Sequence, residues 1–467
     1  MKLLFVGPLF PLPAHSGGQI AALETLRSLA PHCELHLLVP PPERDREANE
    51  TELRRQLPDV HLHFYPEHVR RGLPMYATAA LAAITGRSYW QLSWRNRALR
   101  RAVARLHARE TFDVVHCEWL QPAFSLLGLD LPLVIRTLDI HFLDMEKWAS
   151  GLPPTAWLRK KYWLAQSKRF RRVEAEMLSA AQVAVTLSAE DEAVLHECGV
   201  RNIVTIPPPR VVEAAAPSIA SVPPLALFVG RLEMTPNREG FFEFANDVWP
   251  LVSSGARKNV RVVFAGGIAG DDIRRCAAEC GIEIHSPLSD AEAARLFAEA
   301  AWFLSPVRSG TGIKIKTLDA MAHGKAMLGF RGAFRGVPAQ SGVHAMVADS
   351  PAELARLFEQ LIDDEPRRRA IGLAAQELIR TDFAPALLGK RLADVYSRIV
   401  KPMLKKESAF VRVIRACFRW WPFPRGSGFF LRLARLVLKT KPVTFDAGGA
   451  FIEGSLADWM ILWTFTR

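Results

Sequence analysis

The chain has 467 residues, of which 49% are apolar and 23% are charged, and its formal net charge is +12. This length exceeds one ordinary domain core, and the apolar content excludes a chain that is disordered throughout. No run of eighteen apolar residues is present, and the first residues, Met1-Lys-Leu-Leu-Phe-Val-Gly7, enter a strand without a signal peptide. We therefore expect a cytoplasmic protein of two domains with an extension.

The six cysteines are scattered along the chain, and they are Cys33, Cys117, Cys198, Cys276, Cys280 and Cys417. The sequence has no Cys-x-x-Cys motif, and we find no pair of histidines at ligand spacing. Cys276 and Cys280 would share one helix face, but two soft ligands alone do not hold a metal. We expect neither a disulfide nor a bound metal.

The first elements in chain order are typical of a doubly wound parallel sheet. We predict a strand over 2–7, a proline-rich loop that ends in Gly17 and Gly18, a helix over 20–29 and a strand over 35–39. Ligands of such sheets bind beyond the carboxyl ends of the strands. The two glycines lie at that edge, and they indicate either a ligand site or simply the start of a helix.

The rest of the first domain is predicted to alternate strands with helices, with strands over 60–65, 112–119, 133–141, 181–188 and 203–206 and helices over 95–109 and 190–197. The strand that begins at residue 133 runs into a loop that carries His141. A histidine needs both geometry and a tuned pKa to be catalytic, so His141 is either a catalytic group or an ordinary loop histidine.

The stretch 157–172 is rich in Lys, Arg and aromatic residues at helical spacing. It indicates either a solvated helix face or contact with an anionic membrane surface. Further on, Pro207-Pro-Pro209 and the low-complexity run 212–224 cannot hold a core, so they mark a linker between two domains.

The second domain repeats the pattern, with strands predicted over 225–231, 260–267, 282–285, 301–304 and 343–347 and helices over 289–300, 318–322, 351–362, 367–380 and 385–401. Its first strand ends at Arg231, and the following helix contains Arg238. Its second strand ends in the pair Gly266 and Gly267.

The strongest functional signal is Pro306-Val-Arg-Ser-Gly-Thr-Gly-Ile-Lys-Ile-Lys-Thr-Leu-Asp-Ala-Met-Ala-His-Gly-Lys325. Gly310 and Gly312 let backbone N–H groups approach an anion closely, and the helix that follows directs its positive end to the same place. Cations surround the turn and suit a diphosphate better than a carboxylate; they are Arg308, Lys314 and Lys316. Asp319 could accept a hydrogen bond from a ribose or sugar hydroxyl. The alternative is a tight turn with solvated cations.

This spelling resembles the donor-sugar loop of glycosyltransferase family four, whose members are retaining enzymes of the GT-B fold. The resemblance covers about residues 1–400 and is most specific between Gly230 and Lys325. It implies two Rossmann-like domains that face each other across a cleft, with a nucleotide-sugar held mainly by the second domain. It also implies a set of donor-binding residues: Gly17, Gly18, Arg231, Arg238, Gly266, Gly267, Arg308, Gly310, Thr311, Gly312, Ile313, Lys314, Lys316 and Asp319.

The chain departs from the family pattern at several positions. Asp319 stands where the family usually has glutamate, and Thr311 stands where many members have an earlier glutamate, so the chain resembles an arginine-bearing branch. Leu138 occupies the place of a histidine that reaches the sugar. Asp139 keeps the next polar position and His141 lies three positions beyond Leu138, so the resemblance implies these two as the catalytic residues.

The composition changes in residues 401–467, which contain twelve Lys or Arg against four Asp or Glu. We predict basic amphipathic helices over 410–421 and 428–439, which can lie on an anionic bilayer. A nucleic-acid partner is not expected, because no recognition motif is present. Residues 408–467 also resemble the N-terminal cap of an FkbM-type methyltransferase, whose S-adenosylmethionine site would lie beyond Arg467.

The predicted fold is α/β of the GT-B type, with an acceptor domain over 1–206, a linker over 207–224, a donor domain over 225–384, a crossover helix over 385–405 and a basic extension over 406–467. The expected function is retaining hexosyl transfer from a nucleotide-sugar to a glycan or lipid-linked acceptor in polysaccharide or glycolipid assembly. Fixed cations would stabilise the departing diphosphate, so neither a metal nor another cofactor is expected. The alternatives are a sugar-nucleotide epimerase and a non-catalytic nucleotide-binding subunit at the membrane. We expect a cytoplasmic location, free or peripheral on the inner face of the membrane.

Overall fold

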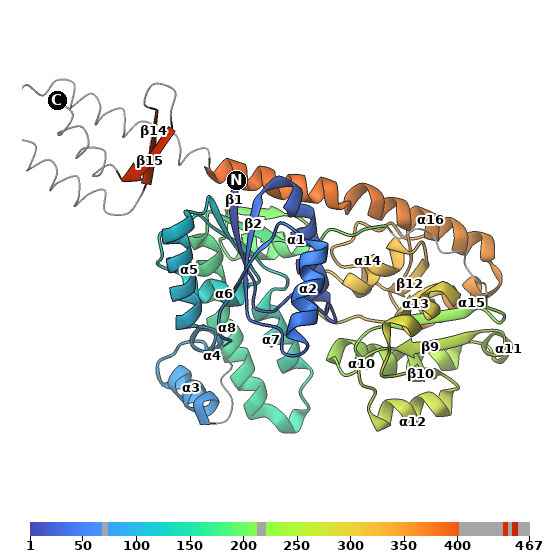
Figure 1. The fold of residues 1–467 in the computed structure, drawn as a ribbon. Helices are drawn as coiled ribbons and strands as arrows, with labels where there is room; N and C mark the ends of the chain where they lie inside the picture. The colour runs from blue at the N-terminus through green and yellow to red at the C-terminus, as the bar shows by residue number, and fades with distance from the viewer. Residues whose placement is uncertain (68–72, 213–220, 401–441, 447–450, 456–467) are drawn as a thin grey trace, which may run out of the picture. The chain divides into compact units, whose positions relative to one another are not determined.

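The computed structural model describes residues 1–67, 73–212, 221–400, 442–446 and 451–455. The chain divides into two compact units, which are residues 1–104 with 112–399 and residues 105–111 with 400–467. The first unit holds two parallel sheets, each with helices packed around it (Figure 1).

The first sheet has seven parallel strands in the order β3-β2-β1-β4-β5-β6-β7. They are β1 Lys2–Val6, β2 Glu34–Val39, β3 His61–Phe64, β4 Val114–Glu118, β5 Leu133–Arg136, β6 Val183–Thr186 and β7 Ile203–Thr205. Strand β1 is apolar and buried from Leu3 to Val6, as expected where helices cover both faces of a parallel sheet. In the register, Leu4 pairs with His36 on one side and with Val115 on the other.

The helices of this part are α1 Gly17–Leu29, α2 Arg46–Gln56, α3 Leu73–Ile84, α4 Tyr89–Ser93, α5 Arg97–Glu110, α6 Leu120–Leu126, α7 His141–Ser150, α8 Trp157–Ala180 and α9 Ala189–Glu197, with short 3-10 helices at Ala30–His32 and Pro154–Ala156. Two starts are set by serine caps. The Ser16 hydroxyl accepts from the N–H of Gln19 at α1, and the Ser188 hydroxyl accepts from the N–H of Asp191 at α9.

The second sheet has six parallel strands in the order β10-β9-β8-β11-β12-β13. They are β8 Leu225–Val229, β9 Arg261–Ala265, β10 Glu283–His285, β11 Ala300–Ser305, β12 Ala326–Phe330 and β13 Met346–Ala348. The helices are α10 Thr235–Glu243, α11 Ser254–Lys258, α12 Asp271–Cys280, α13 Asp290–Glu299, α14 Ile315–Ala322, α15 Pro351–Asp363 and α16 Glu365–Asp382, with a π-helical turn at Phe244–Val248 and 3-10 helices at Trp249–Leu251 and Arg331–Phe334. An aromatic core holds the layers together, and it includes Phe228, Phe241, Phe244, Phe264, Trp302 and Phe358.

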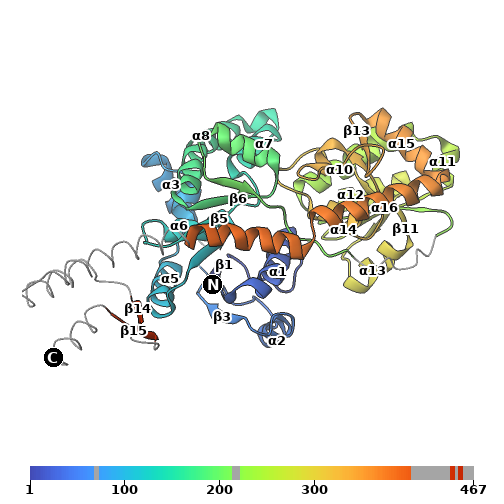
Figure 2. The same cartoon turned by 90° about the horizontal axis from the view of Figure 1, so that it is seen from above.

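A helix over 385–400 follows α16 in the chain and packs on the first sheet's side of the unit (Figure 2). The buried Tyr396 hydroxyl forms a hydrogen bond of 2.8 Å with His116 Nδ1. Arg391 also donates to the carbonyl oxygen of Thr205, at 3.1 Å. The described part of the predicted crossover helix therefore contacts the strands of the first sheet.

Three sequence predictions of local structure were wrong in detail. Gly17 and Gly18 are the first residues of α1 and not part of the loop before it, because Ser16 supplies the cap. His141 begins α7, where a loop was expected. The strand predicted over 343–347 is shorter and later, since β13 is Met346–Ala348 and the residues before it form a turn.

The second unit contains an antiparallel pair, β14 Pro442–Asp446 and β15 Phe451–Ser455. The amphipathic helices predicted over 410–421 and 428–439 lie outside the described residues, as does most of the segment that resembles a methyltransferase cap. Within the part of the chain that the structure describes, no helix has the length and apolar character needed to cross a membrane.

Candidate functional site

The glycine turn predicted from the sequence connects β11 to α14. Gly310 and Gly312 have φ values of +98° and +66°, a region that L-residues with a side chain rarely adopt. The turn therefore requires glycine at both positions. Ile313 is buried beyond the turn and lies against Gly336, where an added Cβ would stand 3.2 Å from the Ile313 Cβ.

Lys314 and Lys316 lie where this turn enters α14. The Lys314 ammonium donates to the carbonyl oxygens of Thr311 and Gly312, at 2.6 and 3.2 Å. The Lys316 ammonium donates to Asn237 Oδ1 and stands over the Phe228 ring, 4.5 Å from its centroid. Their partners are neutral, so among the described residues neither ammonium has a carboxylate within ion-pair distance.

Burial makes these two charges costly. Burial, opposed by the nearby Asp139, lowers the pKa of Lys314 to about 8. Burial and the adjacent charge of Lys314 lower the pKa of Lys316 to about 7. An anion bound at the turn would offset this cost, because it would pair with both ammonium groups.

Asn237 connects Lys316 to Arg231, another predicted cation of this domain. Its Nδ2 donates to the carbonyl oxygen of Arg231 at 2.8 Å, while its Oδ1 accepts from Lys316. Asn237 was not among the predicted site residues. Its only signal in the sequence was its position at the start of the helix that follows the Gly230-Arg231 strand end.

The three predicted arginines of this domain are paired with carboxylates. The exposed Arg231 donates from Nε to Glu233 at 2.7 Å, and Arg308 donates to Glu243 at 2.5 Å. Arg238 forms a double hydrogen bond with Asp272 at the start of α12; Arg308 also lies 3.6 Å over the Phe330 ring. Their charges are therefore partly compensated, in contrast to the two lysines.

The glycine pair at the end of β9 lies beside Arg231. An added Cβ at Gly266 would stand 2.9 Å from the Gly230 carbonyl oxygen, and one at Gly267 would overlap Glu233. The N–H of Ile268 donates to Glu233 at 2.8 Å. The Gly266–Gly267 turn and the Arg231 strand end thus form one continuous surface.

Asp319, in the second turn of α14, pairs with Arg210 at 2.5 Å. Arg210 lies in the segment predicted as the linker, and its backbone N–H donates to the carbonyl oxygen of Phe383. The carboxylate predicted to bind a hydroxyl is therefore engaged by a side chain of the same molecule.

The glycine turn packs directly against the loop after β5. An added Cβ at Gly312 would overlap Asp139 Oδ1, and it would stand 2.6 Å from the Leu138 carbonyl oxygen. The Thr311 hydroxyl lies 3.5 Å from Asp139 Oδ1 and also donates to Asp144. Burial, together with the negative charge of Asp144, raises the pKa of Asp139 to about 6.

His141 lies two residues further on, in an aromatic surrounding. Its Nδ1 is 3.1 Å from Glu174 Oε1, and its backbone N–H donates to the same carboxylate. Its ring meets Trp90, Trp94 and Phe170 edge to face. Burial opposes the charged ring, but the hydrogen bond and charge of Glu174 outweigh it, so the pKa of His141 is raised.

The amino end of α1 approaches the amino end of α14. An added Cβ at Gly17 would stand 3.2 Å from Ile315, and one at Gly18 would overlap the Trp119 ring. Trp119 itself has φ +73°, an unusual value for a bulky residue. Both predicted glycines are thus needed for close packing, and the positive ends of two helices meet at this place.

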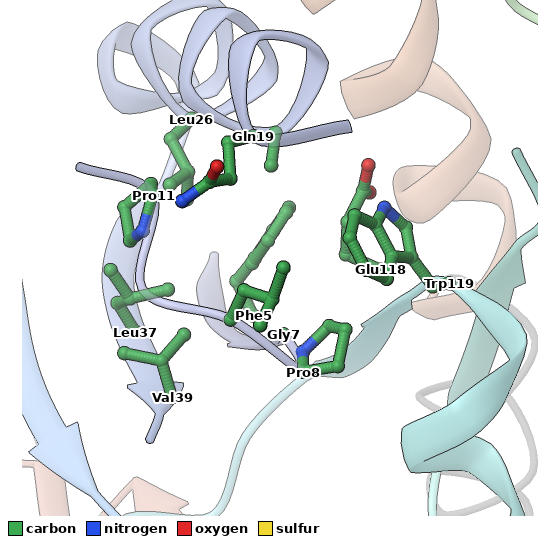
Figure 3. Close-up of a pocket in the computed structure, with 12 residues that line it drawn as sticks. Phe5, Gly7, Pro8, Pro11, Gln19, Leu26, Leu37, Val39, Glu118 and Trp119 are labelled. Atoms are coloured by element: carbon green, nitrogen blue, oxygen red, sulfur yellow. The ribbon is translucent and has the colours of Figure 1, made fainter. Parts of the chain in front are cut away.

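A small pocket opens beside this contact, at the carboxyl ends of β1, β2 and β4 (Figure 3). Its walls are mostly apolar, with Phe5, Pro8 and Leu37 among them, and Gln19 and Glu118 are its polar groups. It lies at the strand ends where the sequence predicted a ligand edge.

The structure brings together Asp139, Thr311, Gly312, Lys314 and Lys316. It places Arg308 and Arg238 in salt bridges with Glu243 and Asp272 instead. Sequence reasoning missed Asp144 and Glu174. Asp144 lies on α7, a helix that was not predicted, and Glu174 lies on α8 beyond the stretch 157–172 that was singled out.

Arg335 makes a second contact between the layers of the first sheet and those of the second. Its guanidinium pairs with the buried Asp191 at 2.7 Å, and the neighbouring N–H of Gly336 donates to Glu190 at 3.3 Å. These residues carried no signal in the sequence.

Comparison with solved structures shows the fold class. HepE from Anabaena in complex with UDP-glucose aligns with a TM-score of 0.58 and 14% identity, over 85% of this chain and 100% of that chain. Sucrose-phosphate synthase from Thermosynechococcus elongatus aligns with a TM-score of 0.62 and 12% identity, over 86% and 100%. A TarM variant from S. aureus, in complex with fondaparinux, α-GlcNAc-glycerol and UDP, gives 0.59 and 9%, over 85% and 100%. The two parallel α/β sheets are those of the GT-B glycosyltransferases.

The family follows from the sequence of the second sheet's domain. Residues 223–364 match the family described as Glycosyl transferases group 1, and this range contains both the Arg231 strand end and the 306–325 loop. This part of the chain is therefore similar to the group 1 glycosyltransferases, which confirms the resemblance drawn from the sequence. Comparison with curated protein sequences gives no match.

Proposed function

We propose that this glycosyltransferase transfers a hexose, with retention of anomeric configuration, from a nucleotide-sugar to a glycan or lipid-linked acceptor. The observation that carries the proposal is the pair of half-buried ammonium groups on Lys314 and Lys316. Among the described residues, neither has a carboxylate within ion-pair distance, and both lie at a glycine turn that enters a helix. An anion with two charged groups, such as a diphosphate, fits this arrangement best.

The donor diphosphate would lie at the turn between Gly310 and Gly312. Backbone N–H groups of the turn, the amino end of α14 and the two lysines would stabilise the charge that develops as the sugar leaves. Arg231 would exchange its exposed partner Glu233 for the nucleotide. Because HepE and TarM were solved with uridine nucleotides, UDP-sugars are the first donors to test.

The acceptor would approach from the first sheet, where Asp139 faces the turn. An ionised Asp139 can accept a hydrogen bond from a sugar hydroxyl, while the raised pKa of His141 favours its charged form close to the same site. Contact between the Asp139 loop and the turn would exclude water that could hydrolyse the donor.

We also propose that the enzyme binds an anionic membrane through α3 and α8. Helix α3 packs on α4, and α4 packs on α8. Exposed apolar side chains lie on both long helices: Leu73, Tyr76, Leu81 and Ile84 on α3, and Trp157, Leu158, Tyr162 and Leu164 on α8. Basic residues stand among those of α8, so the surface combines the two features of an interfacial helix.

Vesicle flotation tests this surface. Leu158→Glu should reduce the fraction bound to anionic vesicles, whereas Leu251→Glu should not. Leu251 is also exposed, at 55% against 64% for Leu158, but lies near α11 in the other domain. Equal binding by both variants and the wild type would remove the proposed surface.

The transfer reaction is tested by incubating the full chain with labelled UDP-sugars, with and without candidate glycan and lipid acceptors. A transferase releases UDP and labels the acceptor. Conversion of the sugar without any acceptor would indicate an epimerase, and tight UDP binding without turnover would indicate a non-catalytic subunit. Either of these results would overturn the proposal.

A further inference from the structure

Three side chains with metal-ligating atoms meet on strands β2 and β3, away from the site described above. Glu34 and His36 are two residues apart on β2 and therefore point to the same face of the sheet. His61 is the direct partner of His36 in the parallel register, so its side chain lies on that face too. Sequence spacing could not show this cluster, because its members come from two strands.

The ligand atoms lie at distances that suit one small cation. His36 Nε2 is 3.1 Å from Glu34 Oε1, and His61 Nε2 is 4.0 Å from the same oxygen. All three ligand atoms lie within 4.8 Å of one another. A tetrahedral zinc ion with bonds of about 2.0–2.1 Å needs ligand atoms roughly 3.3 Å apart. His61 is 55% exposed, so its ring has room to turn toward an ion.

A fourth residue orients the buried histidine. His36 Nδ1 is 3.1 Å from His63 Nε2, and the two rings stack with their planes 7° apart. The opposite ring nitrogen, Nε2, faces Glu34. Holding one imidazole nitrogen in a hydrogen bond while the other faces the ion is the usual arrangement around a metal-bound histidine.

We propose that Glu34, His36 and His61 bind one Zn²⁺ ion, with a water molecule in the fourth position. Two imidazole nitrogens and one carboxylate oxygen form a donor set typical of zinc. The sequence had predicted no metal, and this proposal departs from that prediction.

The position of the cluster indicates a structural ion. Glu34 and His61 are the first residues of their strands, so the cluster lies at the amino ends of the strands, whereas Asp139 and the pocket lie at the carboxyl ends. Strand β3 is the edge of the seven-stranded sheet, and β2 is its neighbour among the described strands. An ion shared between β2 and β3 would hold this edge strand in place.

One cation on the same carboxylate competes with zinc. Lys2 Nζ lies 3.2 Å from Glu34 Oε1. Zinc would have to displace this ammonium or bind the other carboxylate oxygen. Removing the lysine charge should therefore tighten zinc binding, a result that a merely structural cluster would not produce.

The test is calorimetric titration of ZnCl₂ into the full chain, freed of any polyhistidine tag and stripped with a chelator. We expect one ion per chain. His61→Ala and Glu34→Gln should each weaken affinity at least about tenfold, since even the loss of an outer partner costs roughly 10–100-fold. His196→Ala is the matched control. His196 also pairs with a glutamate, Glu192 at 3.4 Å, but among the described residues it belongs to no group of three ligating side chains.

Two further measurements distinguish weaker zinc binding from misfolding of the variants. His61 is exposed, so its variant should keep the wild-type Tm without metal. Zinc at about a hundredfold above the wild-type Kd should then raise the Tm of the wild type clearly more than that of the variant. Lys2→Met should bind zinc more tightly than the wild type. No binding by the wild type, or equal affinity in His61→Ala, would overturn the proposal.

Discussion

Lys316 is the residue on which the proposed donor site depends most. It is half-buried, its pKa is lowered to about 7, and its hydrogen-bond partner is the neutral Asn237. Its charge is therefore present below about pH 7 and is lost as the pH rises, and the charge of Lys314 follows near pH 8. Arginine would keep its charge throughout this range.

Nucleotide binding should therefore weaken with rising pH. We expect the Kd for UDP to increase between pH 7 and pH 9, by up to about tenfold per pH unit for one lost proton. Calorimetric titration checks this, with Lys316→Arg as the variant that should lose less affinity. A Kd that does not change over this range would show that neither lysine binds the diphosphate.

We expect protonation of Asp139 to limit the activity at acid pH. Burial raises its pKa to about 6, so it is protonated below that pH and cannot accept a hydrogen bond with full strength. We expect kcat/KM to fall as the pH drops through about 6. Asp139→Asn should lower kcat by roughly 10²-fold and remove this acid limb, as measured by a pH–rate profile. An unaltered acid limb in the variant would assign it to another group.

At the same scale, the sequence predicted most of the residues that now lie together. Thr311, Gly312, Lys314 and Lys316 belong to one contiguous loop, so their proximity follows from chain connectivity. Asn237 and Asp144 could not be found in this way, because they reach the loop only when separate helices fold against it.

Among the elements, the turn before α14 packs directly against the loop after β5. Gly312 and Gly86 both have φ +66°, but an added Cβ overlaps Asp139 at Gly312 and meets nothing within 4 Å at Gly86. Alanine at either position costs about 1–2 kcal/mol of backbone strain. Only Gly312→Ala should also push the turn before α14 away from the loop after β5.

We therefore expect Gly312→Ala to lower kcat/KM at least about tenfold, since small displacements of a positioned group have large kinetic effects. Gly86→Ala should lose stability and keep its kcat/KM. Steady-state kinetics and thermal unfolding separate the two effects. Equal kcat/KM for both variants would show that the contact with Asp139 does not matter for turnover.

The helix over 385–400 is held to the first sheet by a buried hydrogen bond. Tyr396→Phe would leave His116 Nδ1 without this partner, 2.8 Å from the missing hydroxyl. The variant should lose about 1–3 kcal/mol of unfolding free energy in a urea titration, because an unsatisfied buried group costs this much. An unchanged stability would mean that water replaces the hydroxyl.

Element prediction succeeded where the periodic pattern was clear and failed at boundaries set by single contacts. The helix predicted over 289–300 is α13, and the Ser289 side chain caps its start by accepting from the N–H of Glu292. The start of α7 at His141 was missed, because Glu174, from the distant helix α8, accepts from its first N–H groups. A partner that is remote in sequence leaves no local pattern.

For the whole molecule, the ion pair between Arg335 and Asp191 joins the layers of the two sheets at 2.7 Å. Asp191→Asn should lower the Tm and weaken the contact between the two layers, because the half-buried Arg335 would lose its carboxylate partner. Small-angle scattering with UDP checks this, and we expect a larger radius of gyration for the variant than for the wild type. Identical radii would show that the pair does not hold the two layers together.

The GT-B architecture was predictable because strand–helix alternation restarts after the linker, and the group 1 family match confirms the resemblance. The identities of the sugar and the acceptor could not be predicted from strand–helix alternation or from the family match, because hydroxyl contacts depend on the shape of the pocket. The pocket beside Glu118 and Trp119 lies at the carboxyl ends of β1, β2 and β4.

The most direct test is a crystal structure of the full chain with UDP. The account predicts the diphosphate within hydrogen-bond distance of Lys316 Nζ and of the backbone N–H groups between Gly310 and Gly312, with Lys314 turned from its carbonyl partners toward a phosphate. A diphosphate bound elsewhere, with both ammonium groups still on Asn237 and the turn carbonyls, would contradict it.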